Sequence, residues 1–222
     1  MLTTKMNSSL KLTDNLKMLF RSGRKQRSKD QLVDSTITIV SGLPRSGTSM
    51  MMKMLEVGGV EPIIDELREA DADNPKGYYE FERVKDMGTG DIDWLIDARG
   101  KSVKVISMLL KDLPDTYNYE VIFMRRSIAE ILASQKKMLL RNDKPTDNIS
   151  DDMIQQLYEK HLSEVFPWME AQPCLRFVQI NYNDLLQKPQ QALTTVNNFL
   201  SHDLDVQAMA HIIDPTLYRQ RQ

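Results

Sequence analysis

The stretch ITIVSGLPRSGTSMMMKML, residues Ile37 to Leu55, decides the fold of this chain. It begins with the β-branched, mostly apolar run Ile37–Val40, which predicts a buried strand. A glycine-bounded loop follows over Ser41–Gly47, and apolar residues at helical spacing predict a helix from about Thr48. A strand, such a loop and a helix together present backbone N–H groups and a helix N-terminus, an arrangement that binds phosphate.

The loop has the glycine spacing of a Walker A sequence but a different cation. Gly42 and Gly47 fit G-x-x-x-x-G, and Ser49 stands at the Ser/Thr position of that pattern. Thr48 takes the place of the usual lysine, and the positive charge is instead Arg45, inside the loop. An arginine binds an anion through a planar fork of donors and stays charged at any working pH. The sequence therefore predicts an anion-binding loop, and a P-loop nucleotide kinase is one interpretation of it.

Composition narrows the class of protein. At 222 residues the chain can form one sizeable core, and its net charge of −2 provides no basic field for duplex nucleic acid. The single cysteine, Cys174, cannot form an intramolecular disulfide and favours a reducing compartment. The three histidines lack metal-ligand spacing, so we expect no metal. Because no apolar run reaches the ~20 residues of a membrane span and no signal-peptide pattern is present, we expect a cytoplasmic protein.

The rest of the chain alternates between predicted strands and helices. Further strands are expected at Ser102–Ile106, Val121–Met124 and Leu175–Ile180, and helices at Ser127–Leu140, Asp151–Glu170 and Pro189–Leu200. This alternation predicts an α/β fold: a P-loop-type, three-layer domain with a central parallel sheet flanked by helices, over residues 35–222. Residues 1–34 are expected to be peripheral, a short amphipathic helix and a basic linker. That helix either packs on the domain or binds a membrane surface or partner.

The run Leu43–Ser49 resembles the 5′-phosphosulfate loop of the sulfotransferases that use 3′-phosphoadenylyl sulfate (PAPS), whose usual form is P-[KR]-S-G-T-[TS]. Its arginine version is similar to that of the protein-tyrosine sulfotransferase branch and of bacterial sulfotransferase-like proteins. The resemblance implies that Arg45, Ser46, Gly47, Thr48 and Ser49 bind the 5′ end of PAPS. Arg45 would neutralise the bridging oxygen as the sulfuryl group departs.

A second match lies downstream. Arg126 closes a predicted strand and Ser134 follows eight residues later, which resembles the family's 3′-phosphate element. The residues between them depart from the family, since Ser127, Ile128 and Ala129 stand where Asp-Pro-Arg is frequent. The resemblance implies that Arg126 and Ser134 bind the 3′-phosphate, that 3′,5′-ADP is the product and that no metal is required.

A transfer to a hydroxyl also needs a base. Asp65-Glu66-Leu67-Arg68 is similar to the Glu-Glu-x-Arg that follows the loop in the tyrosine-sulfotransferase branch, so Glu66 is the first candidate base and Arg68 a transition-state or substrate contact. Glu80 is the reserve candidate, and Asp73 is a weaker one. Lys104 resembles a strand lysine near the sulfuryl group of several sulfotransferases, or is an ordinary edge-strand lysine.

The predicted function is therefore sulfuryl transfer from PAPS to an acceptor hydroxyl by in-line displacement. The sequence is compatible with four classes of acceptor: a small molecule, a carbohydrate, a lipid or a peptide. A non-catalytic nucleotide- or anion-binding module remains the other alternative beside the kinase. A kinase would need a carboxylate at a strand end to hold Mg²⁺, and the predicted strands supply none in place.

Overall fold

The computed structural model describes residues 35–65, 78–141 and 150–213. The predicted peripheral segment 1–34 lies outside these ranges. So do Glu66, Arg68 and Asp73, and with them the first candidate base and its predicted neighbour.

A four-stranded sheet forms the centre of the described structure. Its strands are β1 (Thr36–Gly42), β2 (Ser102–Lys104), β3 (Asn118–Arg125) and β4 (Leu175–Asn181), in the order β2-β1-β3-β4. All three neighbouring pairs are parallel, which confirms the predicted parallel sheet. β2 is shorter than predicted, because the Val105 amide makes the last bond to the Val40 carbonyl (3.0 Å) before the chain enters the 3-10 helix η3 (Ser107–Asp112).

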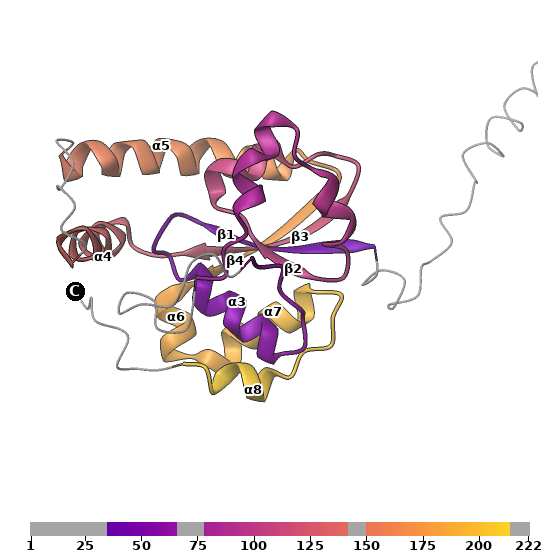
Figure 1. The fold of residues 1–222 in the computed structure, drawn as a ribbon. Coiled ribbons are helices and arrows are strands. Elements are labelled where there is room, and N and C mark those ends of the chain that lie inside the picture. The colour runs from indigo at the N-terminus through magenta and orange to yellow at the C-terminus, as the bar shows by residue number, and fades with distance from the viewer. Residues whose placement is uncertain (1–34, 66–77, 142–149, 214–222) are drawn as a thin grey trace, which may run out of the picture.

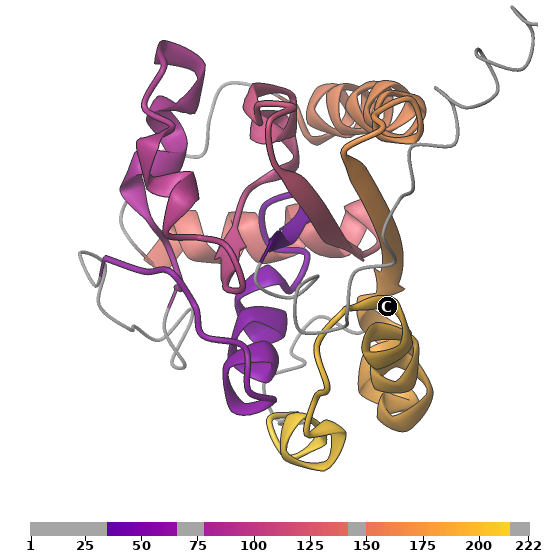
Figure 2. The ribbon, with the colours of Figure 1, turned by 90° about the vertical axis from the view of Figure 1, so that its right-hand side faces the viewer.

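Alternating side chains of the strands feed two cores, one on each face of the sheet. Ile37 and Ile39 of β1 pack into the first core, and Val40 packs into the second. The first face is covered by α5 (Asp151–Glu170) and by η3 with two more 3-10 helices, η1 (Glu82–Thr89) and η2 (Asp93–Ile96). The second is covered by α3 (Thr48–Val57), α6 (Tyr182–Gln187), α7 (Pro189–Phe199) and α8 (Val206–Ala210). Figure 1 shows the three layers, with α5 above the strands and α3, α7 and α8 below them. The turned view in Figure 2 shows the same order of layers, with the strands between α5 and the helices of the second face.

Helix α4 (Ile128–Arg141) lies beside the carboxyl edge of the sheet rather than over a face (Figure 1). A small third cluster holds it there: Leu43 of the loop after β1 packs with Ile131 and Leu132 of α4 and with Tyr158 of α5. Because all four strands are parallel, their carboxyl ends meet at this edge, where ligands bind in open α/β sheets. The loop and α4 are therefore held together where a ligand is expected. No helix in the described ranges combines the length and apolar character needed to cross a membrane.

Candidate nucleotide-binding site

The loop between β1 and α3 is a tight turn with unusual backbone angles. Arg45 (φ 68°) and Gly47 (φ 99°) both adopt left-handed conformations, and the Ser46 amide donates to the Leu43 carbonyl at 3.2 Å. Turns of this kind direct successive backbone N–H groups into a concavity that accepts an anion. The Ser46 side chain is 1% exposed, and its hydroxyl has no hydrogen-bond partner among the described residues.

Packing explains why both ends of the loop are glycine. A Cβ on Gly42 would lie 2.5 Å from the Ser46 Oγ and 2.7 Å from the Met124 carbonyl oxygen. A Cβ on Gly47 would lie 2.4 Å from Cδ2 of the Tyr182 ring. The G-x-x-x-x-G spacing is therefore required by the close approach of β3 on one side and of α6 on the other.

The start of α3 contributes the helix N-terminus. The first backbone bond back to the loop is from the Met51 amide to the Gly47 carbonyl (3.2 Å), so the amides of Thr48 and Ser49 precede the helical hydrogen-bond ladder. Such amides, with the positive end of the helix dipole, favour an anion. The Ser49 hydroxyl is turned elsewhere and donates to the Tyr78 carbonyl at 3.1 Å.

Three residues that were predicted to bind the 5′ and 3′ ends of a nucleotide lie close together at the carboxyl edge of the sheet. The Arg45 Nε donates to the Ser134 Oγ of α4 at 3.1 Å. The Arg126 guanidinium, just past β3, donates to the Arg45 carbonyl oxygen at 3.2 Å. The loop, the end of β3 and the second turn of α4 thus form one cluster on one side of the molecule.

Arg126 is held by neighbours that sequence reasoning did not single out. Its Nε donates to Glu130 at 2.8 Å, with the two side chains only 8% and 6% exposed, and its guanidinium stacks over the Tyr182 ring at 4.5 Å. Glu130 also accepts from the Asn183 side-chain amide at 2.9 Å. These contacts fix the guanidinium plane, and Glu130 balances its charge. The available sequence signal was an acidic residue, Glu130, in the first turn of α4 and four residues after Arg126.

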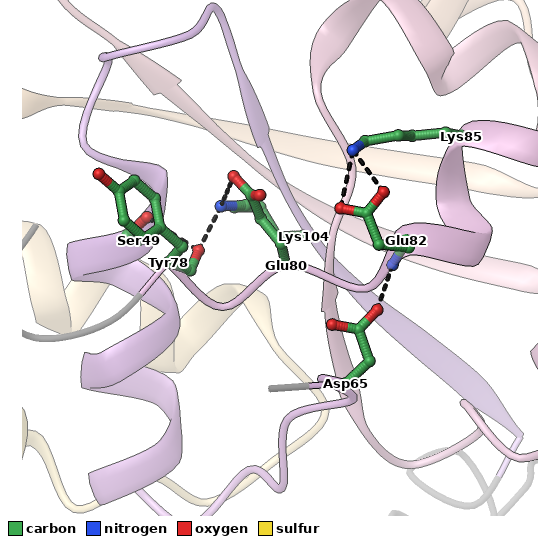
Figure 3. Close-up of polar contacts among 7 residues, drawn as sticks. All are labelled: Ser49, Asp65, Tyr78, Glu80, Glu82, Lys85 and Lys104. Carbon is green, nitrogen blue, oxygen red and sulfur yellow. Dashed lines mark hydrogen bonds and ion pairs between the residues drawn. The ribbon is translucent and has the colours of Figure 1, made fainter. Parts of the chain in front are cut away.

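Lys104 lies at the carboxyl end of β2, an edge strand of the described sheet, with its side chain 8% exposed. Its ammonium group donates to the Tyr78 carbonyl and lies 3.4 Å from the Glu80 carboxylate, as Figure 3 shows. The Ser49 hydroxyl shares the Tyr78 carbonyl. The reserve candidate base is therefore in contact with the predicted strand lysine, and both are connected to the first turn of α3.

The strand ends offer no acidic metal ligand in the part of the chain that the structure describes. The last residues of the four strands are Gly42, Lys104, Arg125 and Asn181. Among the described residues, no group of three or more His, Cys, Asp or Glu side chains could hold a metal ion. The site as described is therefore a cluster of cations, hydroxyls and backbone amides, with Glu80 and Glu130 as its carboxylates.

The architecture is that of an α/β domain of the P-loop type, with a central parallel sheet, a loop leading into a helix and helices on both faces. No family model matches the sequence, and no curated protein matches it. Among solved structures, the sulfotransferase domain of the Synechococcus PCC 7002 olefin synthase has a TM-score of 0.52 and 14% identity, covering 89% of this chain and 88% of that one. A sulfotransferase domain from the curacin biosynthetic pathway has a TM-score of 0.46 and 18% identity, covering 85% and 78%. The first likeness shows that the chain has a sulfotransferase-like fold.

Proposed function

We propose that this protein is a sulfotransferase that moves a sulfuryl group from PAPS to an acceptor hydroxyl. One observation carries the proposal: at the carboxyl edge of the sheet, Arg45 is hydrogen-bonded both to Ser134, through its side chain, and to Arg126, through its carbonyl oxygen. A nucleotide with phosphates at both the 5′ and 3′ positions needs cationic and hydroxyl groups at two neighbouring points. The sulfotransferase-like fold supports the proposal, because it puts a phosphate-type loop at this edge.

In this proposal the loop binds the 5′-phosphosulfate through the amides of Gly47, Thr48 and Ser49. Arg45 turns its guanidinium from Ser134 toward the bridging oxygen, where negative charge develops as the sulfuryl group leaves. Ser134 and Arg126 take the 3′-phosphate. The acceptor oxygen attacks sulfur in line, and 3′,5′-ADP departs.

Metal is not required by this chemistry. The sulfuryl group carries less negative charge than a phosphoryl group, so cationic side chains and amides can stabilise its transfer. A P-loop kinase instead depends on Mg²⁺. We further propose a cytoplasmic location, which is compatible with the single, free Cys174.

Calorimetry without metal tests the proposal. We expect 3′,5′-ADP to bind at least about 10-fold more tightly than ADP or ATP, because one charge-assisted pair contributes about 1.5–3 kcal/mol. Arg126→Lys keeps the charge but loses the planar fork, so it should weaken 3′,5′-ADP binding about 10-fold. Arg125→Lys is the matched control, since Arg125 contacts Gln179 (3.0 Å) and the Phe166 ring instead. A preference for ADP or ATP would overturn the proposal and favour a kinase.

A further inference from the structure

The segment from Tyr78 to Glu80 joins the first turn of α3 to the end of β2. The Tyr78 carbonyl accepts from both the Ser49 hydroxyl (3.1 Å) and the Lys104 ammonium group. The Asp65 amide donates to the Glu80 carbonyl at 3.3 Å, which fixes the far end of the segment. Glu80 is thereby held beside the loop that we propose binds the sulfuryl donor.

Tyr79, between those two residues, has a backbone angle that bulky side chains rarely adopt, φ 53°. Its hydroxyl donates to Glu56 of α3 at 2.5 Å, and Glu56 also accepts from Lys53 at 2.7 Å. Burial, followed by the bond to Glu56, raises the pKa of Tyr79 to about 12, so the hydroxyl remains a donor at any working pH. This anchor holds the turn at Tyr79, and Figure 3 shows the result: the Tyr78 carbonyl and the Glu80 carboxylate both face the Lys104 ammonium. Backbone strain of this kind collects at functional sites.

The neighbouring described acidic groups have other roles. Asp65 accepts from the Glu82 amide at 2.5 Å, and Glu82 pairs with Lys85 at 2.5 Å (Figure 3). Glu80 contacts Lys104, and its side chain is 24% exposed, so an entering hydroxyl can reach it. Ile106 stands two residues beyond Lys104 in extended backbone and is 36% exposed, which offers apolar surface on the same side of the strand.

We propose that Glu80 is the general base of the transfer reaction and that Lys104 is its electrostatic partner. This inference rests on the proposed sulfotransferase function. Glu80 takes the proton from the acceptor hydroxyl while the acceptor oxygen forms a bond to sulfur. The bond from sulfur to the bridging oxygen of PAPS breaks, and its electron pair leaves with 3′,5′-ADP. Lys104 stabilises negative charge on the sulfuryl oxygens, and the apolar surface at Ile106 favours an aromatic or otherwise apolar acceptor.

The test uses the full chain with PAPS and two phenols of similar size, p-nitrophenol and p-cresol. Phenol-dependent release of 3′,5′-ADP, the rate with the phenol minus the rate without it, is the readout, because this difference excludes transfer to water. Glu80→Gln should slow transfer to p-cresol about 100-fold or more, the usual contribution of a positioned base. It should slow transfer to p-nitrophenol much less, because that phenol ionises in water without help. Glu82→Gln, the same change two residues along, should match the wild-type protein with both phenols.

Calorimetry separates this inference from the function on which it depends. Glu80→Gln should bind 3′,5′-ADP as the wild-type protein does, which also shows that the variant is folded. An equal loss with both phenols, or no loss, would show that Glu80 is not the base while leaving the sulfotransferase intact. A wild-type protein that releases no 3′,5′-ADP with either phenol would overturn the inference, whereas a protein that prefers ADP or ATP to 3′,5′-ADP would overturn the function as well.

Discussion

Replacing Gly47 with alanine tests the packing that shapes the loop. Gly47→Ala should destabilise the fold in two ways, and the two losses of free energy should add. The left-handed backbone (φ 99°) costs an L-residue about 1–2 kcal/mol. The new Cβ would also lie 2.4 Å from the Tyr182 ring, and overpacking of this kind costs about 1–3 kcal/mol. The free energy of unfolding should therefore fall by about 2–5 kcal/mol.

Gly59 provides a matched control for that substitution. It has nearly the same backbone angle, φ 102°, but a Cβ there meets nothing within 4 Å. Gly59→Ala should lose only the backbone contribution, about 1–2 kcal/mol. Urea unfolding measures both values, and the effect of alanine on the unfolded chain is common to the two variants. Equal losses would refute the claim that the Tyr182 ring sets the position of the loop. A displaced ring should also disturb its stacking on Arg126 and so weaken 3′,5′-ADP binding in Gly47→Ala alone.

Three further predictions concern the site and its surroundings. Ser134→Ala should weaken 3′,5′-ADP binding about 3- to 10-fold and leave 5′-AMP unchanged, as measured by calorimetry; equal losses would contradict a role at the 3′-phosphate. Glu130→Ala leaves the buried Arg126 without its carboxylate partner, so urea unfolding should show a loss of about 3–5 kcal/mol in the free energy of unfolding. Glu82→Ala, which breaks an exposed ion pair, should lose less than about 1 kcal/mol. Burial lowers the pKa of His161, so the unfolded chain binds this proton more readily and stability falls as pH drops through the histidine's ordinary value of 6.5. His161→Gln should flatten the fall in melting temperature between about pH 7 and 5, and an unchanged slope would exclude this source.

The main elements of the fold could be predicted from the sequence because their patterns are strong. α5 begins and ends at the predicted residues, and its start is marked by Ser150, whose side chain accepts from the Met153 amide. The apolar run Ile37–Val40 and the glycine-bounded loop gave β1 and the start of α3. In such segments, periodicity and capping favour the same structure as the tertiary contacts do.

The short helices α6 and η1 were not predicted, because their stability comes from contacts that a local pattern does not contain. The six residues of α6 are too few for a periodic signal, although Asn181 caps them by accepting from the Asn183 and Asp184 amides at 2.8 and 3.2 Å. Likewise η1 forms around Val84 and Met87, which are buried against the first core. Isolated helices of this length are not stable in water without such packing.

For the candidate site, likewise, local sequence motifs identified residues but did not predict the long-range contacts between them. The motifs indicated Arg45, Arg126 and Ser134 but could not show that Arg45 contacts both of the others. The contact between Glu80 and Lys104 joins the segment before η1 to the end of β2, and nothing in the spacing of the two residues predicts it. Sequence reasoning therefore left Glu66 and Glu80 as alternative bases, and the geometry around Lys104 is what favours Glu80 in our proposal.

A crystal structure of the protein bound to 3′,5′-ADP is the most direct test of the central claim. We predict the 5′-phosphate on the amides of Gly47 to Ser49 and the 3′-phosphate within hydrogen-bond distance of both Arg126 and Ser134, with the Arg45–Ser134 bond broken. A nucleotide bound away from the carboxyl edge of the sheet, or bound there with its 3′-phosphate away from both Arg126 and Ser134, would contradict the account.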